Sequence, residues 1–169
     1  SFEHISKMIK FGAQIIDVGG ESTRPGSKTI NPKIEWKRVK FVIQNFKKKY
    51  KNICLSIDTR KSELMMKSIN YDVDLINDVS GFKFDKESLS KLKDFKIPKV
   101  LHHMQGTPNT MQKNPKYKNV LLDIYDFFEE SINSRFFDKK IIIDPGIGFG
   151  KSLKHNLTLI SKISLFHSL

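Results

Sequence analysis

Five short aliphatic runs, each ending in a polar residue, constrain the fold of this 169-residue chain more than any other feature. The runs cover residues 14–17, 53–58, 74–77, 99–102 and 141–144. Ile, Val and Leu fill them without alternating with polar residues, as is typical of strands buried on both faces of a parallel sheet. Helical periods separate the runs, which gives one helix followed by five strand–helix units. The sequence therefore predicts an α/β fold with a parallel sheet, in one domain over residues 1–169.

Two of the predicted helices have well-marked apolar stripes. One begins behind Asn31-Pro32, with Asn as the N-cap and Pro in the first turn. Its predicted stripe consists of Ile34, Arg38, Phe41, Val42, Asn45 and Phe46. For the last helix, the predicted stripe consists of Leu157, Ile160 and Leu165. We expect these stripes to pack against the sheet.

Polar residues stand at the end of every predicted strand. They are Asp17, Asp58, Asn77 with Asp78, His102 with His103, and Asp144. Each one alone is also explained as a helix cap or a turn residue. Together they predict a binding site at the carboxyl edge of the sheet. That site would lie on the rim of a parallel barrel, or at the switch point of an open doubly wound sheet.

Two kinds of site fit these strand ends. Asp58, Asn77 and Asp144 offer hydrogen-bond acceptors, which suit a planar heterocycle with an amidine-like edge. The alternative is a metal centre built from Asp17, Asp58, His103 and Asp144. Against the metal centre, no His-x-His or His-x-x-x-His pair is present, and adjacent histidines face opposite sides of a continuing strand.

Two glycine-rich loops follow the first and last of these strands. In residues 17–26 (DVGGESTRPG), glycines let backbone N–H groups approach an anion, and Arg24 is able to hold a phosphate with two hydrogen bonds. Residues 144–151 (DPGIGFGK) could form an anion nest with Lys151, with Phe149 as an aromatic wall. Both loops are also consistent with packed turns. Neither contains the spacing of a dinucleotide fingerprint or of a P-loop, so those functions are not indicated.

The formal charge of +12 raises the question of nucleic-acid binding. Only 4 of the 30 basic residues are Arg, and the lysines are spread along the chain, which favours a solvated surface and no nucleic-acid partner. No run of 18 apolar residues is present, so no membrane span is predicted. The chain begins without a signal-peptide pattern, and its one cysteine, Cys54, lies in an apolar run. These features predict a cytoplasmic protein.

Five segments together resemble the dihydropteroate synthases, a family of pterin-binding TIM barrels. They are residues 17–26 (DVGGESTRPG), 56–59 (SIDT), 76–81 (INDVSG), 103–112 (HMQGTPNTMQ) and 144–151 (DPGIGFGK). Their order and spacing also match the family. The resemblance implies a parallel (β/α)8 barrel of which about five βα units, strands 2–6, are present. We therefore expect an internal fragment that lacks the first and the last two strands of the barrel.

The resemblance also implies a reaction. The family joins 6-hydroxymethyl-7,8-dihydropterin diphosphate to para-aminobenzoate, with release of pyrophosphate, in folate biosynthesis. It uses Mg²⁺, whose usual Asn ligand lies in a first-strand loop that this sequence does not match, and it is the target of sulfonamides. The complete enzyme is expected to be a homodimer. Two alternatives stay open: an inactive remnant that at most binds pterin, and a metal-dependent barrel hydrolase or aldolase.

Roles for individual residues follow from the resemblance. Asp58, Asn77 and Asp144 correspond to the pterin-binding acceptors. The expected catalytic residues are Thr23 and Arg24, on the mobile loop that contacts the diphosphate. Pro25 and Phe149 correspond to the wall around the aminobenzoate ring. Gly148 and His102 complete the expected substrate-binding residues, and His102 takes a position where Met is common in the pterin pocket.

Overall fold

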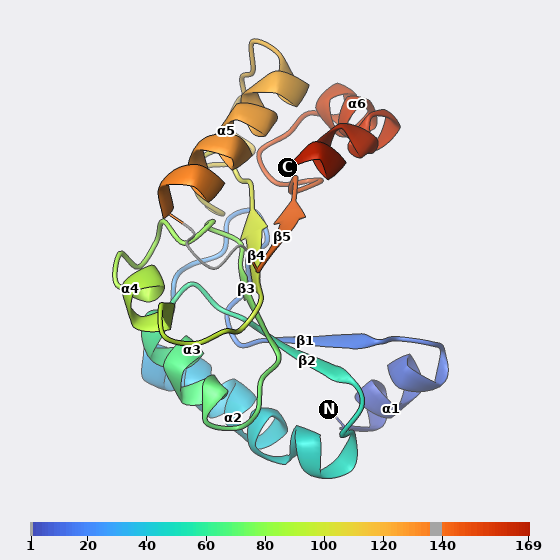
Figure 1. The fold of residues 1–169 in the computed structure, drawn as a ribbon, viewed down its shortest axis with the longest axis vertical. Helices are drawn as coiled ribbons and strands as arrows, with labels where there is room; N and C mark the ends of the chain where they lie inside the picture. The colour runs from blue at the N-terminus through green and yellow to red at the C-terminus, as the bar shows by residue number, and fades with distance from the viewer. Residues whose placement is uncertain (1, 136–139) are drawn as a thin grey trace.

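The computed structural model describes residues 2–135 and 140–169, and its elements follow the predicted order (Figure 1). The helices are α1 (Phe2–Lys10), α2 (Pro32–Lys49), α3 (Ser62–Ile69), α4 (Ser88–Leu92), α5 (Val120–Arg135), α6 (Leu153–Ser161) and the 3-10 helix η1 (Ile163–Ser168). The strands are β1 (Ile15–Gly19), β2 (Cys54–Asp58), β3 (Leu75–Asp78), β4 (Lys99–His102) and β5 (Ile141–Asp144). The α/β prediction is confirmed, and β1 continues two residues beyond its predicted end at Asp17.

The five strands form one parallel sheet in the order β1-β2-β3-β4-β5. Strands that follow each other in the chain are therefore neighbours in the sheet, as in the wall of a barrel. The order does not reverse, so the sheet has no topological switch point between its described strands. Figure 1 shows the direction of the strands turning strongly between β1 and β5. All five carboxyl ends lie at one edge of the sheet.

The two faces of the sheet differ in what covers them. The covered face carries Ile16, Leu55, Ile57, Ile76 and Leu101, each no more than 3% exposed and packed in the core with residues of α2 to α5. The opposite face, called the open face below, consists of the residues that alternate with these. At its two edges Ile15 is 50% exposed and Ile142 is 48% exposed. The prediction of strands buried on both faces is therefore wrong for β1 and β5, because helices in the described ranges pack on one face only.

Helix α2 begins as predicted, but of its predicted stripe only Val42 and Phe46 lie in the core. The side chain of Asn31 caps it by accepting from the Lys33 N–H (2.9 Å), and Pro32 is its first residue. The buried residues are Glu35, Val39, Val42, Ile43 and Phe46. Predicted core residues Ile34 and Phe41 are 49% and 63% exposed, because the helix is rotated to bring the charged Glu35 inside. None of the helices in the described residues is long and apolar enough to cross a membrane.

The predicted stripe of α6 is also wrong. Leu157 and Ile160 are 58% and 57% exposed, whereas Leu159 is fully buried and Phe166 of η1 is also part of the core. The helix is held at its start by Ser152, whose hydroxyl accepts from the His155 N–H while His155 bonds back to the Ser152 N–H. This capping box fixes the residue at which α6 begins.

Candidate active site

Polar side chains from all five strands share the open face at the carboxyl edge. Asp58 pairs with Asn77 in the register of β2 and β3, and His102 pairs with Asp144 in that of β4 and β5. Side chains of paired residues in a parallel sheet point to the same face. Asn77 also donates from Nδ2 to Oδ2 of Asp17 on β1, at 2.9 Å. The structure therefore places the three predicted acceptors and His102 on one face, and it adds Asp17, for which no heterocycle-binding role was predicted.

Asp58 is the most strongly perturbed carboxyl group of this set. Burial raises its pKa to about 7, and the nearby carboxylates of Asp17, Asp78 and Glu35 act in the same direction. The neighbour across the sheet is Gly19, where a Cβ would lie 3.0 Å from Oδ2 of Asp58. Glycine at that position leaves room for the carboxyl group on the open face. A ligand that donates hydrogen bonds here would stabilise the charged form of Asp58.

Two buried acceptors of the site have no hydrogen-bond partner among the described residues. They are Oδ1 of Asn77 and Nε2 of His102. Nδ1 of His102 lies 2.8 Å from the carbonyl oxygen of Val79, a contact that needs the ring proton on Nδ1. Burial lowers the pKa of His102, so the neutral ring presents Nε2 as an acceptor, 3.9 Å from Oδ2 of Asp144. Unpartnered buried acceptors are uncommon in folded proteins, and here they lie beside two carboxyl groups.

The loop after β5 shapes one side of the site. The Gly146 N–H donates to Oδ1 of Asp144 (2.8 Å), which fixes this carboxylate. Gly146 has φ +68°, and a Cβ there would overlap the carbonyl oxygen of His103, so only glycine fits. The ring of Phe149 meets His102 edge to face, with 4.7 Å between centroids. Gly148 uses both backbone groups within the chain, donating to Asn156 Oδ1 (2.9 Å) and accepting from Gln112 Nε2 (2.6 Å).

Lys151, at the end of the same loop, does not form the anion nest considered from the sequence. It is 3% exposed, and its Nζ donates to the carbonyl oxygens of Phe149 (2.8 Å) and His103 (3.2 Å). Burial lowers its pKa to about 8. The amino group is thus directed into the protein and not toward an anion, which favours the alternative of a packed turn.

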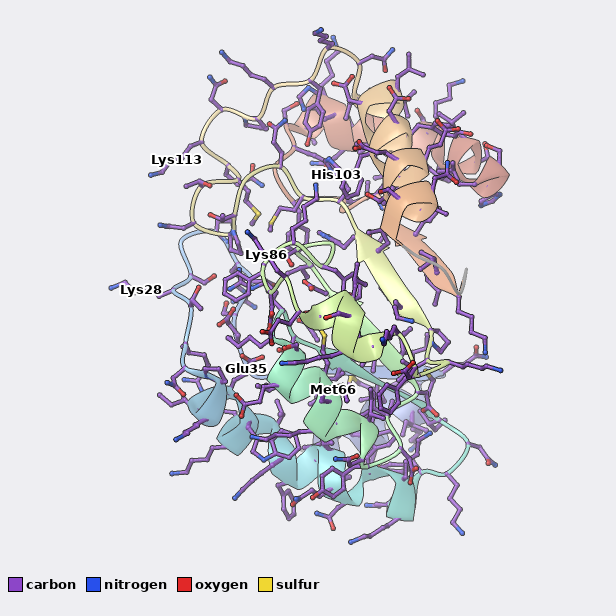
Figure 2. All side chains as sticks on the ribbon, turned by 60° about the vertical axis from the view of Figure 1, so that its left-hand side comes forward. Lys28, Glu35, Met66, Lys86, His103 and Lys113 are labelled. Carbon is purple, nitrogen blue, oxygen red and sulfur yellow. The ribbon has the colours of Figure 1, made fainter. Side chains whose placement is uncertain are left out.

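The four residues considered for a metal centre are not brought together. His103 lies on the helix side of the sheet, beside α5 in Figure 2, and its ring packs on Phe127 at 4.9 Å. His102 and His103 thus face opposite sides, as predicted. Asp78 is also buried away from the open face, and its Oδ1 accepts from the N–H and hydroxyl of Ser80. Within residues 2–135 and 140–169, no group of three or more His, Cys, Asp and Glu side chains is arranged to hold a metal ion.

The loop that carries Thr23, Arg24 and Pro25 lies between β1 and α2. Thr23 is half-buried, whereas Arg24 and Pro25 are exposed. The Gly26 N–H donates to the Pro108 carbonyl oxygen at 3.1 Å, which joins the end of this loop to the loop after β4. Within the part of the chain that the structure describes, the Arg24 guanidinium has no hydrogen-bond or ion-pair partner.

A buried ion cluster holds the start of this loop, and the sequence interpretation did not anticipate it. Glu21 pairs with Arg60 and Lys61, and Lys61 also pairs with Glu35 of α2. All four side chains are at most 7% exposed, and Glu35 also accepts from the Thr59 hydroxyl at 2.6 Å. Burial alone would raise the pKa of Glu21, but the hydrogen bonds from Lys61 and Arg60 hold it below its usual range. The only sequence signal was the Arg60-Lys61 pair directly after a strand end.

Comparison with known proteins agrees with this geometry. The family model described as pterin binding enzyme matches residues 1–169. Dihydropteroate synthase from Escherichia coli (strain K12) is 37% identical over 169 residues, which cover 98% of this chain and 59% of that protein. The corresponding protein of Synechocystis sp. is 36% identical over 160 residues, covering 92% and 55%.

Solved structures show the same fold. Yersinia pestis dihydropteroate synthase, in a sulfonamide drug complex, has a TM-score of 0.93 and 35% identity, covering 98% of this chain and 61% of that one. The Xanthomonas albilineans enzyme with 4-aminobenzoic acid has a TM-score of 0.88 and 32% identity, covering 99% and 60%. The chain thus spans about three fifths of the length of these relatives. Its five-stranded sheet is part of a TIM barrel, as the sequence predicted.

Proposed function

Because the chain belongs to the family of pterin-binding enzymes, we propose that it forms the pterin-binding part of a dihydropteroate synthase. The proposed reaction condenses 6-hydroxymethyl-7,8-dihydropterin diphosphate with para-aminobenzoate and releases pyrophosphate. The observation that supports this best is the set of acceptors on the open face. Asn77 Oδ1 and His102 Nε2 are buried without partners beside Asp58 and Asp144.

A pterin ring complements this set. Its pyrimidinone edge presents N–H groups of a ring nitrogen and an amino group side by side, and the open face presents acceptors with few donors. Hydrogen bonds to a charged acceptor contribute about 1.5–3 kcal/mol each. Asp58, with its pKa raised to about 7, is the acceptor that gains most from such donors, since they favour its charged form.

The second substrate is proposed to lie against Phe149 and Pro25. Phe149 is next to the pterin acceptors, because its ring contacts His102. Pro25 is exposed on the loop that joins the segment around Pro108 through Gly26. Gly148 is proposed to contribute through its lack of a side chain, since a Cβ there meets open space and both its backbone groups are already bonded.

The reaction needs positioning and charge neutralisation more than acid–base chemistry. The amine nitrogen forms a bond to the CH₂ carbon while the C–O bond to the diphosphate breaks. The bonding electrons leave with pyrophosphate, and the extra proton of the amine passes to solvent. Arg24, with a free guanidinium, is proposed to hold the departing diphosphate, and Thr23 to donate a hydrogen bond to it. Holding both reactants close together on the open face is proposed to supply the remaining rate enhancement.

Mg²⁺ is the cofactor expected from the family, but the described residues do not assemble a site for it. Oδ2 of Asp17 already accepts a hydrogen bond from Asn77, and no cluster of three ligands exists in the ranges that the structure describes. Mg²⁺ is commonly bound by one or two carboxylates together with substrate phosphates. In that mode the diphosphate substrate itself supplies ligands, and we assign no residue of this chain to the ion.

The function is tested by incubating the complete natural protein with the pterin diphosphate and para-aminobenzoate and measuring dihydropteroate. Calorimetry with the pterin alone runs in parallel. Product formation supports the synthase and excludes a remnant that only binds pterin. Pterin binding without product would favour the remnant, and absence of both would refute the assignment of the open face. As a control on the site, Asp144→Ala is expected to abolish pterin binding, because it removes an acceptor of the ring edge.

A further inference from the structure

Lys151 is a buried lysine for which the proposed reaction has no direct use. It stands between the glycine-rich loop and α6 and is 3% exposed. Its Nζ is within hydrogen-bond distance of three acceptors: the carbonyl oxygens of Phe149 (2.8 Å) and His103 (3.2 Å), and Nδ1 of His103 (3.1 Å). A buried ammonium group is costly unless such partners surround it.

These three acceptors come from two separate segments. Phe149 belongs to the loop after β5, whereas His103 follows directly after β4. The ammonium has three hydrogens and no acceptor, so His103 must accept at Nδ1 with its ring neutral. Burial first, and the charge of Lys151 second, lower the pKa of His103 to about 3, which agrees with this state. Lys151 therefore connects the loop to the end of β4.

The segment that Lys151 holds is one whose own backbone is permissive. Phe149 lies between Gly148 (φ +85°) and Gly150 (φ +63°), both in the left-handed region. Glycines on both sides allow the peptides around Phe149 many orientations. The Phe149 N–H donates to the Gly146 carbonyl oxygen within the loop (3.0 Å), and contacts from outside hold the other side of the residue. On the far side the Tyr117 hydroxyl donates to the Gly150 carbonyl oxygen at 2.8 Å. Lys151 holds the carbonyl of Phe149 itself, and the ring on that residue contacts His102.

We propose that Lys151 is a positioning residue that fixes the ring of Phe149 against His102 and so sets the binding of the aminobenzoate. The inference rests on the proposed function, in which Phe149 is a wall for that ring. It assigns Lys151 a role in binding the aminobenzoate and none in binding the pterin, because none of the pterin acceptors depends on it. Asp58 and Asn77 belong to β2 and β3, His102 is held by the Val79 carbonyl oxygen, and Asp144 is held by the Gly146 N–H. Lys151 contacts neither substrate.

The test is a double-mutant cycle in the complete natural protein with Lys151→Met, Phe149→Leu and the combined variant. Lys151→Met is expected to raise KM for para-aminobenzoate about 10-fold and to change KM for the pterin diphosphate less than 2-fold. In the Phe149→Leu background, Lys151→Met is expected to raise KM for para-aminobenzoate less than about 3-fold, because the ring that Lys151 positions is gone. Lys154→Met removes a charge from an exposed lysine of α6 and should change neither KM.

Several outcomes would overturn the inference. One is an equal rise of both KM values, and another is an undiminished effect of Lys151→Met in the Phe149→Leu background. If Lys151→Met does not fold, Lys151→Gln, which keeps an NH₂ donor group for the carbonyls, is judged by the same two criteria. Failure of both variants to fold would show that Lys151 is needed for the fold instead. If the unmodified protein makes no dihydropteroate, the proposed function fails, which is distinct from a working enzyme whose Lys151 variants are unselective.

Discussion

Replacing Asp58 by Asn tests the assignment of the open face with the smallest change of shape. Asp58 ends β2 between Gly19 of β1 and Asn77 of β3. Asn keeps the size of the side chain and one acceptor, but it removes the charge and turns the second acceptor into a donor. That new donor would face the donors of the pterin ring. We therefore expect Asp58→Asn to weaken binding more than the loss of one neutral hydrogen bond would.

The size of the effect follows from the two hydrogen bonds that the carboxylate is proposed to accept. Each contributes about 1.5–3 kcal/mol, and Asn forfeits one of them entirely and the charge assistance of the other. A loss of about 3 kcal/mol corresponds to a rise in Kd on the order of 100-fold. Half-protonation of Asp58 near pH 7 reduces the affinity of the unmodified protein only about 2-fold, so the difference remains measurable.

The pH dependence gives a second signature of the same residue. A proton on Asp58 competes with the ring donors, so pterin affinity should fall as the pH drops below about 7, and Asp58→Asn should remove this dependence. The free energy of unfolding of the ligand-free protein should instead fall as the pH rises. Because the folded pKa of Asp58 is raised from its ordinary 3.8, its contribution is fully present below pH 3.8 and is lost as the pH rises through about 7.

Calorimetry with a pterin between pH 5.5 and 8.5, with urea unfolding over the same range, measures both effects. The matched control is Asp126→Asn, a change of the same type at an exposed position of α5. A Kd for Asp58→Asn within 3-fold of the unmodified protein would refute the reasoning, as would an unchanged pH dependence of binding.

Three further predictions concern the loops and the ion cluster. Glu21→Gln should lower the free energy of unfolding by about 3–5 kcal/mol in urea at pH 7, because Arg60 and Lys61 are left buried without a carboxylate partner. Since the pKa of Glu21 is lowered in the folded protein, its contribution is present above the ordinary value of 4.5 and is lost as the pH falls through the folded value. A difference in free energy between the variant and the unmodified protein that stays the same at low pH would contradict this. Gly146→Ala should cost more than Gly26→Ala by urea unfolding, because both have positive φ and share about 1–3 kcal/mol of strain, but only the Cβ at Gly146 overlaps the His103 carbonyl. Arg24→Ala should change the free energy of unfolding by less than about 0.5 kcal/mol and lower dihydropteroate formation by roughly 100-fold, whereas Lys28→Ala, on an exposed side chain that projects outward in Figure 2, should leave turnover unchanged.

The sequence predicts the strand order and most of the site because both depend on local rules. An aliphatic run that ends in a polar residue marks a strand and its carboxyl end, and parallel strands bring those ends to one edge. These rules did not predict that Asp17 lies beside Asn77 in the heterocycle-binding set. It lies two residues before the end of β1, and only the register places it on the same face as Asn77. Alternation along the strand would have identified it if the end of β1 had been known.

Two of the errors, in α2 and at Lys151, share a physical cause, which is that tertiary partners can bury a charge. Glu35 is 0% exposed because Lys61 and Thr59 satisfy its carboxylate, and this rotates α2 away from the stripe through Ile34. Lys151 is directed inward because three acceptors from two segments meet at its Nζ. An apolar pattern scores both residues as surface, since it contains no information about partners that are 26 or 48 positions away.

The buried ion cluster and Arg24 both concern the loop between β1 and α2, which is held at its two ends. Glu21 is fixed by Arg60, Lys61 and the Ile30 N–H, which donates to its carboxylate at 2.9 Å. At the other end, Gly26 is held by the Pro108 carbonyl oxygen. The residues between these two points include Thr23 and Arg24. A segment held at both ends cannot leave the rim, yet its middle is able to turn toward an anion without breaking the ion cluster. This is why Glu21→Gln should lower both stability and turnover, whereas Arg24→Ala should lower turnover alone.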